Sequence, residues 1–144
     1  MKEFLKILSK YLFLFIMGGL MYYGIEIIYR GYSHWSMFIL GGFCFIGLGL
    51  INEKLPWQTP VWKQCLIGSG LITGLEFITG VLVNLVLGLA VWDYSALPLN
   101  ILGQVCLPFS AIWALLALVG IVLDDWVRYW FFKEEKPHYN WKLK

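Results

Sequence analysis

Four long apolar runs divide the chain, and short polar or turn-forming segments separate them. The runs cover residues 11–29, 36–53, 63–90 and 101–123. A helix needs roughly 20 apolar residues to cross the hydrocarbon core of a bilayer, and each run is close to that length or longer. The pattern therefore predicts an all-α, polytopic membrane protein, a single domain over residues 1–144 built as a bundle of about four transmembrane helices.

Tryptophan and proline mark the boundaries between the runs. Trp35 stands where the second run begins, Pro56 and Pro60 lie in the connection that follows it, and Pro98 lies between the third and fourth runs. Tryptophan is enriched at the membrane–water interface, and proline interrupts helices. The third run is longer than a perpendicular span requires, so we expect this helix to tilt or to fray at one end.

The last segment of the chain, residues 124–144, is polar and rich in aromatic residues. Asp124 and Asp125 end the fourth apolar run, and aromatic side chains are then mixed with Arg128 and Lys133. This mixture is typical of a helix that lies along the lipid headgroups. We therefore predict a short C-terminal interfacial helix in this tail.

Composition supports a membrane environment. The chain is 60% hydrophobic and only 14% charged, whereas soluble domains are roughly one quarter charged. One core in a soluble domain of this size would leave large apolar patches exposed to water. The net charge of +2 provides no basic field for nucleic acid. The lipid bilayer is the expected partner, and nucleic acid is not.

The basic residues are distributed unevenly between the two sides of the predicted bundle. Ten of the 11 lysines and arginines lie in the N-terminal segment, the second connection or the tail, and Arg30 alone lies in the first connection. The ten are Lys2, Lys6, Lys10, Lys54, Lys63, Arg128, Lys133, Lys136, Lys142 and Lys144. With four spans these three segments share one side, and the positive-inside rule places both termini in the cytoplasm.

The sequence contains no pattern that predicts a metal site, a cofactor or a known catalytic motif. The three cysteines and two histidines are widely spaced along the chain. They form no zinc or haem ligand pattern, and we predict no metal and no cofactor. The chain also lacks G-x-x-x-x-G-K-[ST], G-x-S-x-G and H-E-x-x-H. The pattern argues against an enzyme and identifies no catalytic residue.

Charged residues gather at the predicted outer side. Glu26 and Arg30 are four residues apart, so they share one helical face and can pair. His34 follows in the first connection, and the predicted topology places Asp93 on the same side. One interpretation is an ion-pair clasp between loops. The other is an outward-facing binding mouth, in which Arg30 contacts an anionic group and His34 carries a proton.

The third run contains a polar stripe. Ser69, Thr73, Glu76, Gly80 and Asn84 follow one another at steps of three or four residues, which places them on one helical face. A carboxyl group near the middle of the bilayer must be protonated, paired or solvated. Such a group can mark a proton or ion path, or it can be a neutral acid bonded to a neighbouring helix.

Asn52 and Glu53 lie at the inner end of the second run. Their ordinary interpretation is a helix end at the interface that partners a nearby lysine.

Five motif strings are similar to those of a known family. They are GYSHWSM (residues 31–37), INE (51–53), TGLEFITG (73–80), WDYSALPLN (92–100) and GQVCLPFSAIW (103–113). With them the chain resembles the ABC-transporter type IV permeases, CmpB-like small bacterial membrane proteins. The resemblance implies a bacterial inner membrane and a separate cytoplasmic ATPase. It also gives Asn52 and Glu53 a role beyond ending a helix. Since one copy encloses little room, a pore implies a homo-oligomer.

Three functional hypotheses follow. The first is a permease-like transporter component that binds or passes a small substrate or a proton through the outer cluster of Arg30, His34 and Asp93 and then Glu76. The second is an intramembrane enzyme for a lipid or lipid-linked substrate, with His34, Asp93 and Glu76 as acid–base groups. The third is a structural or regulatory subunit. The candidate site residues are Arg30, His34, Ser36, Asn52, Glu53, Glu76, Trp92, Asp93, Tyr94 and Asn100.

Overall fold

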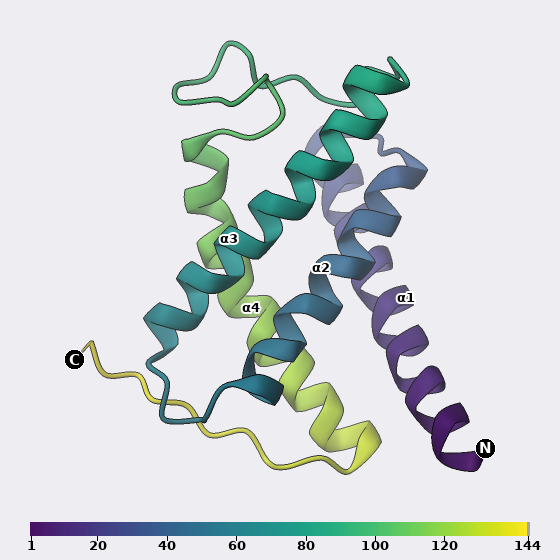
Figure 1. The fold of residues 1–144 in the computed structure, drawn as a ribbon, viewed down its shortest axis with the longest axis vertical. Coiled ribbons are helices and arrows are strands. Elements are labelled where there is room, and N and C mark those ends of the chain that lie inside the picture. The colour runs from purple at the N-terminus through teal and green to yellow at the C-terminus, as the bar shows by residue number, and fades with distance from the viewer. Residues whose placement is uncertain (144) are drawn as a thin grey trace.

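A computed structural model describes residues 1–143 and is built from helices (Figure 1). The elements are α1 (Lys2–Arg30), α2 (Trp35–Lys54), α3 (Val61–Gly80), the π-helix η1 (Val81–Val86) and α4 (Leu107–Phe132). Because η1 continues α3, the third span runs from Val61 to Val86, and all four spans are long and apolar enough to cross a membrane. The structure confirms the predicted all-α membrane bundle.

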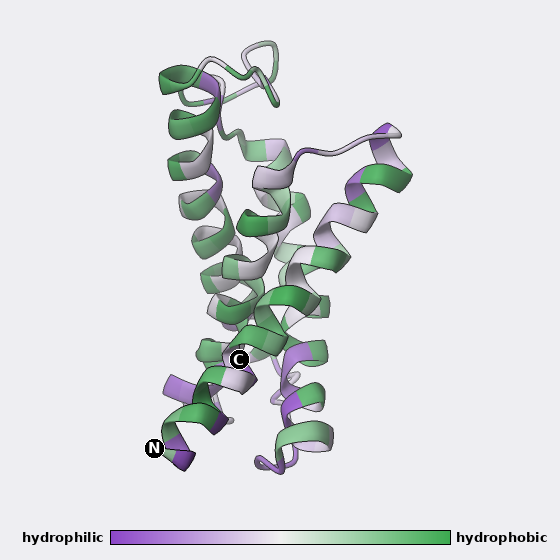
Figure 2. Ribbon diagram, turned by 90° about the vertical axis from the view of Figure 1, so that its right-hand side faces the viewer, coloured by the Kyte–Doolittle hydropathy of each residue, from purple (hydrophilic) through white to green (hydrophobic). Residues whose placement is uncertain are grey.

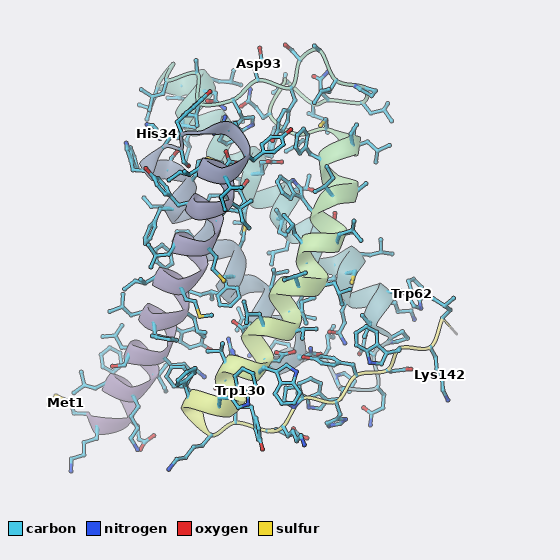
Figure 3. The ribbon with its side chains drawn as sticks, turned by 180° about the vertical axis from the view of Figure 1, so that it is seen from behind. Met1, His34, Trp62, Asp93, Trp130 and Lys142 are labelled. Atoms are coloured by element: carbon cyan, nitrogen blue, oxygen red, sulfur yellow. The ribbon has the colours of Figure 1, made fainter. Side chains whose placement is uncertain are left out.

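Both described ends of the chain lie at the same end of the bundle. Met1 and Lys142 lie there with the α2–α3 connection, residues 55–60, and we call this the terminal end (Figure 3). His34 and the loop of residues 87–106 lie at the opposite end, the loop end. Figure 2 shows hydrophobic segments along the helices and hydrophilic segments mainly near the ends of the bundle. This arrangement is the one that an even number of spans requires.

Glycines bring α1 and α2 into close contact. A Cβ atom on Gly18 would overlap Phe45, and one on Gly41 would overlap Tyr22. Small residues allow helix backbones to approach closely in lipid. α2 is the most buried of the four spans, because α1 packs on one side of it and α3 and α4 pack on the other.

The loop of residues 87–106 is folded over the loop end by a side chain from η1. Asn84 Oδ1 accepts a hydrogen bond from the backbone N–H of Val91 at 2.6 Å, and its amide donates to Gln104 Oε1 at 2.7 Å. The third span ends before Gly88, which has a positive φ of 65°, so it is shorter than the predicted 63–90. A left-handed turn at Leu102 and Gly103 delays the start of α4 from the predicted residue 101 to Leu107.

The C-terminal segment differs from the prediction of a separate interfacial helix. α4 continues without interruption through Asp124 and Asp125 to Phe132, and Lys133 then ends it in a left-handed conformation. The two aspartates do not end the helix because they are buried and paired inside the bundle, where water is not needed to solvate them.

The tail after α4 contains no helix in its described residues, 133–143. It runs instead as an extended strap along the α2–α3 connection. The backbone N–H of Val61 donates to Asn140 O at 2.9 Å, and the Asn140 side chain donates to Gln58 O at 2.8 Å. Lys144, the last residue of the predicted tail and of the charge count, lies outside the described residues.

Candidate functional site

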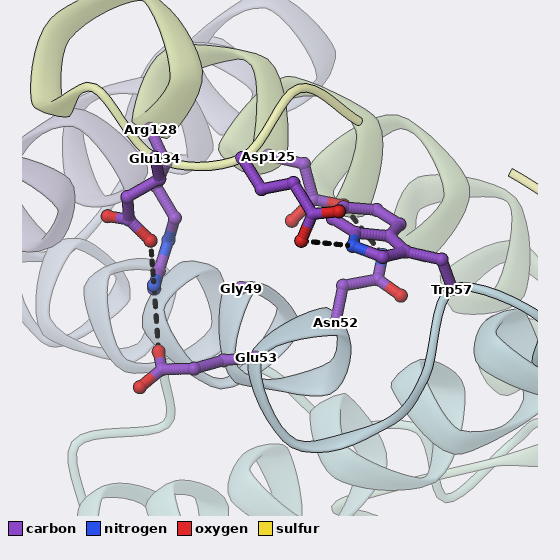
Figure 4. Close-up of a pocket in the computed structure, with 8 residues that line it drawn as sticks. Gly49, Asn52, Glu53, Trp57, Asp125, Arg128 and Glu134 are labelled. Carbon is purple, nitrogen blue, oxygen red and sulfur yellow. Dashed lines mark hydrogen bonds and ion pairs between the residues drawn. The ribbon is translucent and has the colours of Figure 1, made fainter. Parts of the chain in front are cut away.

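A polar pocket lies at the terminal end, between the last turns of α2 and α4 and the start of the tail (Figure 4). It encloses a cavity of about 190 Å³. Its walls are formed by Gly49, Asn52, Glu53, Trp57, Asp125, Arg128, Glu134 and Glu135. The pocket therefore joins segments that are up to 86 residues apart in the sequence, from Gly49 to Glu135.

Arg128 is the central charge of this pocket. Its side chain is only 4% exposed. The guanidinium donates from Nε to Asp124 Oδ1 at 2.6 Å and from Nη1 to Glu53 Oε2 at 2.8 Å, and Glu134 Oε1 lies 3.7 Å from Nη1. Removal of a charge from water is costly unless several partners compensate it. Carboxylates from α2, α4 and the tail supply that compensation here.

A second set of bonds fixes Asp125. The Asn52 amide donates to Asp125 Oδ2 at 2.6 Å, and the Tyr139 hydroxyl donates to the same oxygen at 3.0 Å. Burial, together with the Asp125 carboxylate, raises the pKa of Tyr139 well above its usual range. The hydroxyl therefore keeps its proton at neutral pH and remains a donor. α2, α4 and the tail are joined at this point.

Gly49 on α2 leaves space for the side chain of Asp124 on α4. A Cβ atom at this position would overlap the Asp124 carboxylate, which is fully buried. Only glycine leaves room for the Asp124 side chain to lie on the α2 backbone beside the pocket.

Three buried polar atoms in or next to the walls of this pocket have no hydrogen-bond partner among the described residues. They are Asn52 Oδ1, Asp124 Oδ2 and Arg128 Nη2. The great majority of buried polar atoms in proteins are paired, and each unpaired one costs about 1–3 kcal/mol. Asn52 and Arg128 also line the cavity, whereas Asp124 lies behind Gly49.

The walls of the pocket carry more acids than bases. Four carboxyl side chains line it, from Glu53, Asp125, Glu134 and Glu135, against the single guanidinium of Arg128. Hydrogen bonds from Trp57 and His138 hold the pKa of Glu135 below its usual range, so this carboxyl is ionised at neutral pH. The surplus of negative charge and of acceptor oxygens is complementary to a small cation with several N–H donors.

Glu76, the central residue of the predicted stripe, is buried, and its carboxyl group is hydrogen-bonded within the protein. Its side chain is 1% exposed. Oε1 accepts from the Trp113 indole and Oε2 accepts from the Tyr94 hydroxyl, each at 3.1 Å. Burial and the Glu76 carboxylate raise the pKa of Tyr94 far above its usual range. Both carboxyl oxygens have protein donors, so Glu76 links α3 to α4 and to the loop of residues 87–106.

The rest of the stripe also faces α4 and the loop. The Ser69 hydroxyl donates to the backbone oxygen of Ser110 at 2.6 Å, and the Thr73 hydroxyl lies 2.7 Å from that of Ser110. A Cβ atom on Gly80 would overlap Gln104. The predicted shared face is therefore present, and it serves helix packing along most of its length.

The predicted outer residues Arg30, His34 and Asp93 share no hydrogen bond or ion pair with one another in residues 1–143. Arg30 forms an ion pair with Glu26 at 2.5 Å and donates to Val91 O at 3.2 Å, which is a clasp between α1 and the loop. His34 Nδ1 accepts from the backbone N–H of Ser36 at 3.2 Å and caps α2. Asp93 accepts from Ser95 N, a bond that lowers its pKa.

Two further candidates at the loop end shape the loop itself. Trp92 donates from its indole to Gln104 O at 3.0 Å, and Asn100 Oδ1 accepts from Gly103 N at 3.0 Å. No hydrogen bond joins His34, Asp93 and Glu76 to one another in residues 1–143, and each of the three bonds to other groups. Among residues 1–143, no group of His, Cys, Asp and Glu side chains is arranged to hold a metal ion.

The sequence pattern indicates Asn52 and Glu53 as candidates, but it places Arg128 and its aspartates in the headgroup region. One local signal was present, because Asp124 and Arg128 are four residues apart and share a helical face. The contacts that make the site, Glu53 to Arg128 and Asn52 to Asp125, join residues more than 70 positions apart. The spacing of residues along the sequence does not indicate such a long-range contact.

Comparison with known proteins identifies one family. The model of the family described as “Putative ABC-transporter type IV” matches residues 13–140, nearly the whole chain. The match includes all eight residues that line the pocket, and it confirms the resemblance found in the motif strings. No curated protein and no solved structure matches the chain.

Proposed function

The chain belongs to the ABC-transporter type IV family, and on this premise we propose that its terminal-end pocket is the substrate site of a membrane transporter subunit, with a small polar cation as the substrate. Family membership and the four apolar helices fit such a subunit. The pocket adds a place where a small molecule can bind, and its chemistry indicates which kind.

One observation carries the proposal: a single cavity of about 190 Å³ is lined by four carboxyl side chains and only one guanidinium. The carboxyl groups come from Glu53 on α2, Asp125 on α4 and Glu134 and Glu135 in the tail, and Asn52 adds an amide to the same wall. A cation with several N–H groups would donate to the carboxylate oxygens of these walls and would reduce the repulsion between the acids. Ligand sites in proteins commonly orient their ligand with a few convergent polar groups.

The positive-inside rule supports a cytoplasmic position for the terminal end in a bacterial inner membrane. The sequence contains no nucleotide-binding motif, so a transporter of this family would require a separate ATPase. The α2–α3 connection and the tail, which are joined to each other at this end, offer the surface on which such a partner would bind. A homo-oligomer would supply the room for a pore that one copy lacks.

The geometry favours this pocket over a route through Arg30, His34 and Asp93 to Glu76. Both oxygens of Glu76 are occupied by protein donors, and Arg30 is held by Glu26 and Val91. The terminal end, in contrast, has a cavity lined by four carboxyl side chains. We therefore assign Glu76 to packing and the terminal-end pocket to binding.

Guanidinium and methylammonium at low-millimolar concentration are suitable probes for this proposal. Isothermal titration of the purified full chain in nanodiscs should show saturable binding of guanidinium, with sodium chloride at equal ionic strength as the blank. Asn52→Ala and Glu53→Gln should each weaken binding about tenfold, since a hydrogen bond to a charged group is worth about 1.5–3 kcal/mol.

Asp93→Asn is the matched control, because it removes one carboxylate charge at the exposed loop end. It should leave the affinity for guanidinium unchanged. Size-exclusion chromatography and circular dichroism establish that each variant is folded. If wild-type protein shows no saturable binding, or if Asp93→Asn weakens binding as much as Asn52→Ala does, the proposed site is wrong.

Transport itself is tested in cells of the source bacterium, which supply any partner ATPase, by the accumulation of labelled guanidinium. Wild-type and Asp93→Asn protein should change accumulation relative to cells that lack the chain, whereas Asn52→Ala should not. Binding without any change in accumulation would retain the site and remove the transport role.

A further inference from the structure

A second cavity at the terminal end is chemically the opposite of the pocket. It is a groove of about 780 Å³ between the first turns of α1 and the end of α4. Four lysines line it, Lys2, Lys6, Lys10 and Lys133, with Glu134 as the one acid. We call it the lysine groove.

Three of the four lysines are available to a ligand. Lys10 is already paired with Glu134 at 3.1 Å, and its side chain is only 18% exposed. Lys2 and Lys133 are exposed and form no ion pair within residues 1–143. Lys6 has only a solvent-exposed contact of 3.6 Å with Glu3, and such surface pairs contribute little. The groove therefore presents unpaired positive charge next to a lysine whose charge is compensated.

Apolar side chains form the rest of the groove. Leu5 and Ile7 of α1 are 51% and 53% exposed, and Phe131 of α4 is 66% exposed. The groove thus offers ammonium groups and a broad apolar wall to the same ligand. A free phosphate ion would use the lysines and leave the wall uncovered, whereas an amphipathic anion would use both.

We propose that the lysine groove binds an anionic phospholipid, with its phosphate among Lys2, Lys6 and Lys133 and its acyl chains against Leu5 and Phe131. Basic pockets between transmembrane helices bind anionic headgroups in this way. The groove lies at the ends of two membrane-spanning helices, where phospholipid headgroups are located. This inference does not depend on the proposed transport function.

The test uses the full chain in micelles, with native mass spectrometry as the measure of bound lipid. Phosphatidylglycerol and phosphatidylcholine with the same acyl chains are the two probes. Wild-type protein should retain phosphatidylglycerol at least tenfold better. The triple variant Lys2→Gln, Lys6→Gln, Lys133→Gln should lose this preference, since each lysine near an anionic surface contributes several-fold in affinity.

The matched control is the triple variant Lys54→Gln, Lys63→Gln, Lys142→Gln. It removes the same charge from exposed positions at the same end of the bundle but outside the groove. It should retain phosphatidylglycerol like wild type. Equal loss in both triple variants would show a general charge effect and would overturn the site, as would equal retention of the two lipids by wild type.

Inorganic phosphate distinguishes a lipid site from a phosphate site. At concentrations that match the ionic strength of a chloride control, it should displace little phosphatidylglycerol, because it cannot contact the apolar wall. Complete displacement by phosphate but not by chloride would overturn the assignment to a lipid.

Discussion

Among single residues at the terminal end, Arg128 should contribute most to the stability of the fold. Its guanidinium is the only base among the walls of the pocket, and it compensates the fully buried Asp124. Loss of one partner from a buried ion pair leaves the other charge without compensation. The consequence for stability should therefore be larger than that of a surface substitution.

We expect Arg128→Gln to lower the free energy of unfolding by about 3–5 kcal/mol, because Asp124 then remains buried without its cation. Reversible unfolding in mixed micelles, followed by circular dichroism, measures this change. The double variant Asp124→Asn, Arg128→Gln should recover part of the loss. A loss below about 1 kcal/mol in Arg128→Gln, the range of a surface pair, would contradict the burial of this network.

Glu76 should behave differently, although it is equally buried. Glu76→Gln keeps one carbonyl acceptor but turns an NH₂ group toward either Tyr94 or Trp113, which are both donors. We expect a loss of roughly 0.6–1.5 kcal/mol in the free energy of unfolding, the range of polar contacts between helices. The affinity for guanidinium should not change.

Titration with guanidinium and micelle unfolding of the same sample separate the two roles of Glu76. Loss of guanidinium binding or of cellular accumulation in a fully folded Glu76→Gln protein would show that Glu76 takes part in binding or passing the substrate. That outcome is the one that the sequence pattern alone favours for an intramembrane carboxylate.

At the scale of helices, most of the fold was predictable because the signal is local. Each span is a long apolar run, and the third run also displays the polar face that packs on α4. The limits of α4 were not predictable. Its start depends on a left-handed turn at Leu102 and Gly103, and its continuation past Asp124 depends on contacts with α2.

Only the α2 residues of the candidate site were predictable from the sequence. Asn52 and Glu53 lie within motif strings, and their role at a helix end gave no indication of a pocket. Their partners come from a segment that resembles an interfacial helix in composition. Aromatic residues mixed with charged residues are also typical of a helix at the membrane surface. Only the packing of α2 against α4 shows that these side chains face inward.

The close approach of α2 and α4 gives a prediction at this scale. Gly49→Ala should lower the free energy of unfolding by about 1–3 kcal/mol, since the added methyl group overlaps the Asp124 carboxylate. Thermal unfolding in micelles provides the measurement. Gly70→Ala on α3 is the control, because nothing lies near the position of its added Cβ atom; alanine there should be neutral or slightly stabilising. Equal effects at the two positions would argue against tight packing at Gly49.

At the scale of the whole molecule, the pocket and the lysine groove share one residue. Glu134 lines both cavities, pairs with Lys10 in the groove and lies 3.7 Å from Arg128 in the pocket. A phosphate bound at Lys2, Lys6 and Lys133 would lie in the same groove as the Lys10–Glu134 pair, and its negative charge would weaken the hold of Lys10 on Glu134. The Glu134 carboxylate would then contribute more to the negative field of the pocket. Binding at the two sites should therefore be coupled through this carboxylate, and the coupling must be reciprocal.

We expect guanidinium to bind about fivefold more tightly in phosphatidylglycerol nanodiscs than in phosphatidylcholine nanodiscs, the lower range of measured coupling between sites. An anionic surface also concentrates cations by itself, so the lipid effect alone does not prove coupling. Glu134→Gln separates the two causes, because it removes the carboxylate shared by the two cavities and leaves the potential of the lipid surface unchanged. In this variant the preference should fall to the small factor that the surface produces, whereas Glu3→Gln, an exposed acid at the same end, should keep it in full. A preference that survives Glu134→Gln undiminished would mean that the two cavities act independently.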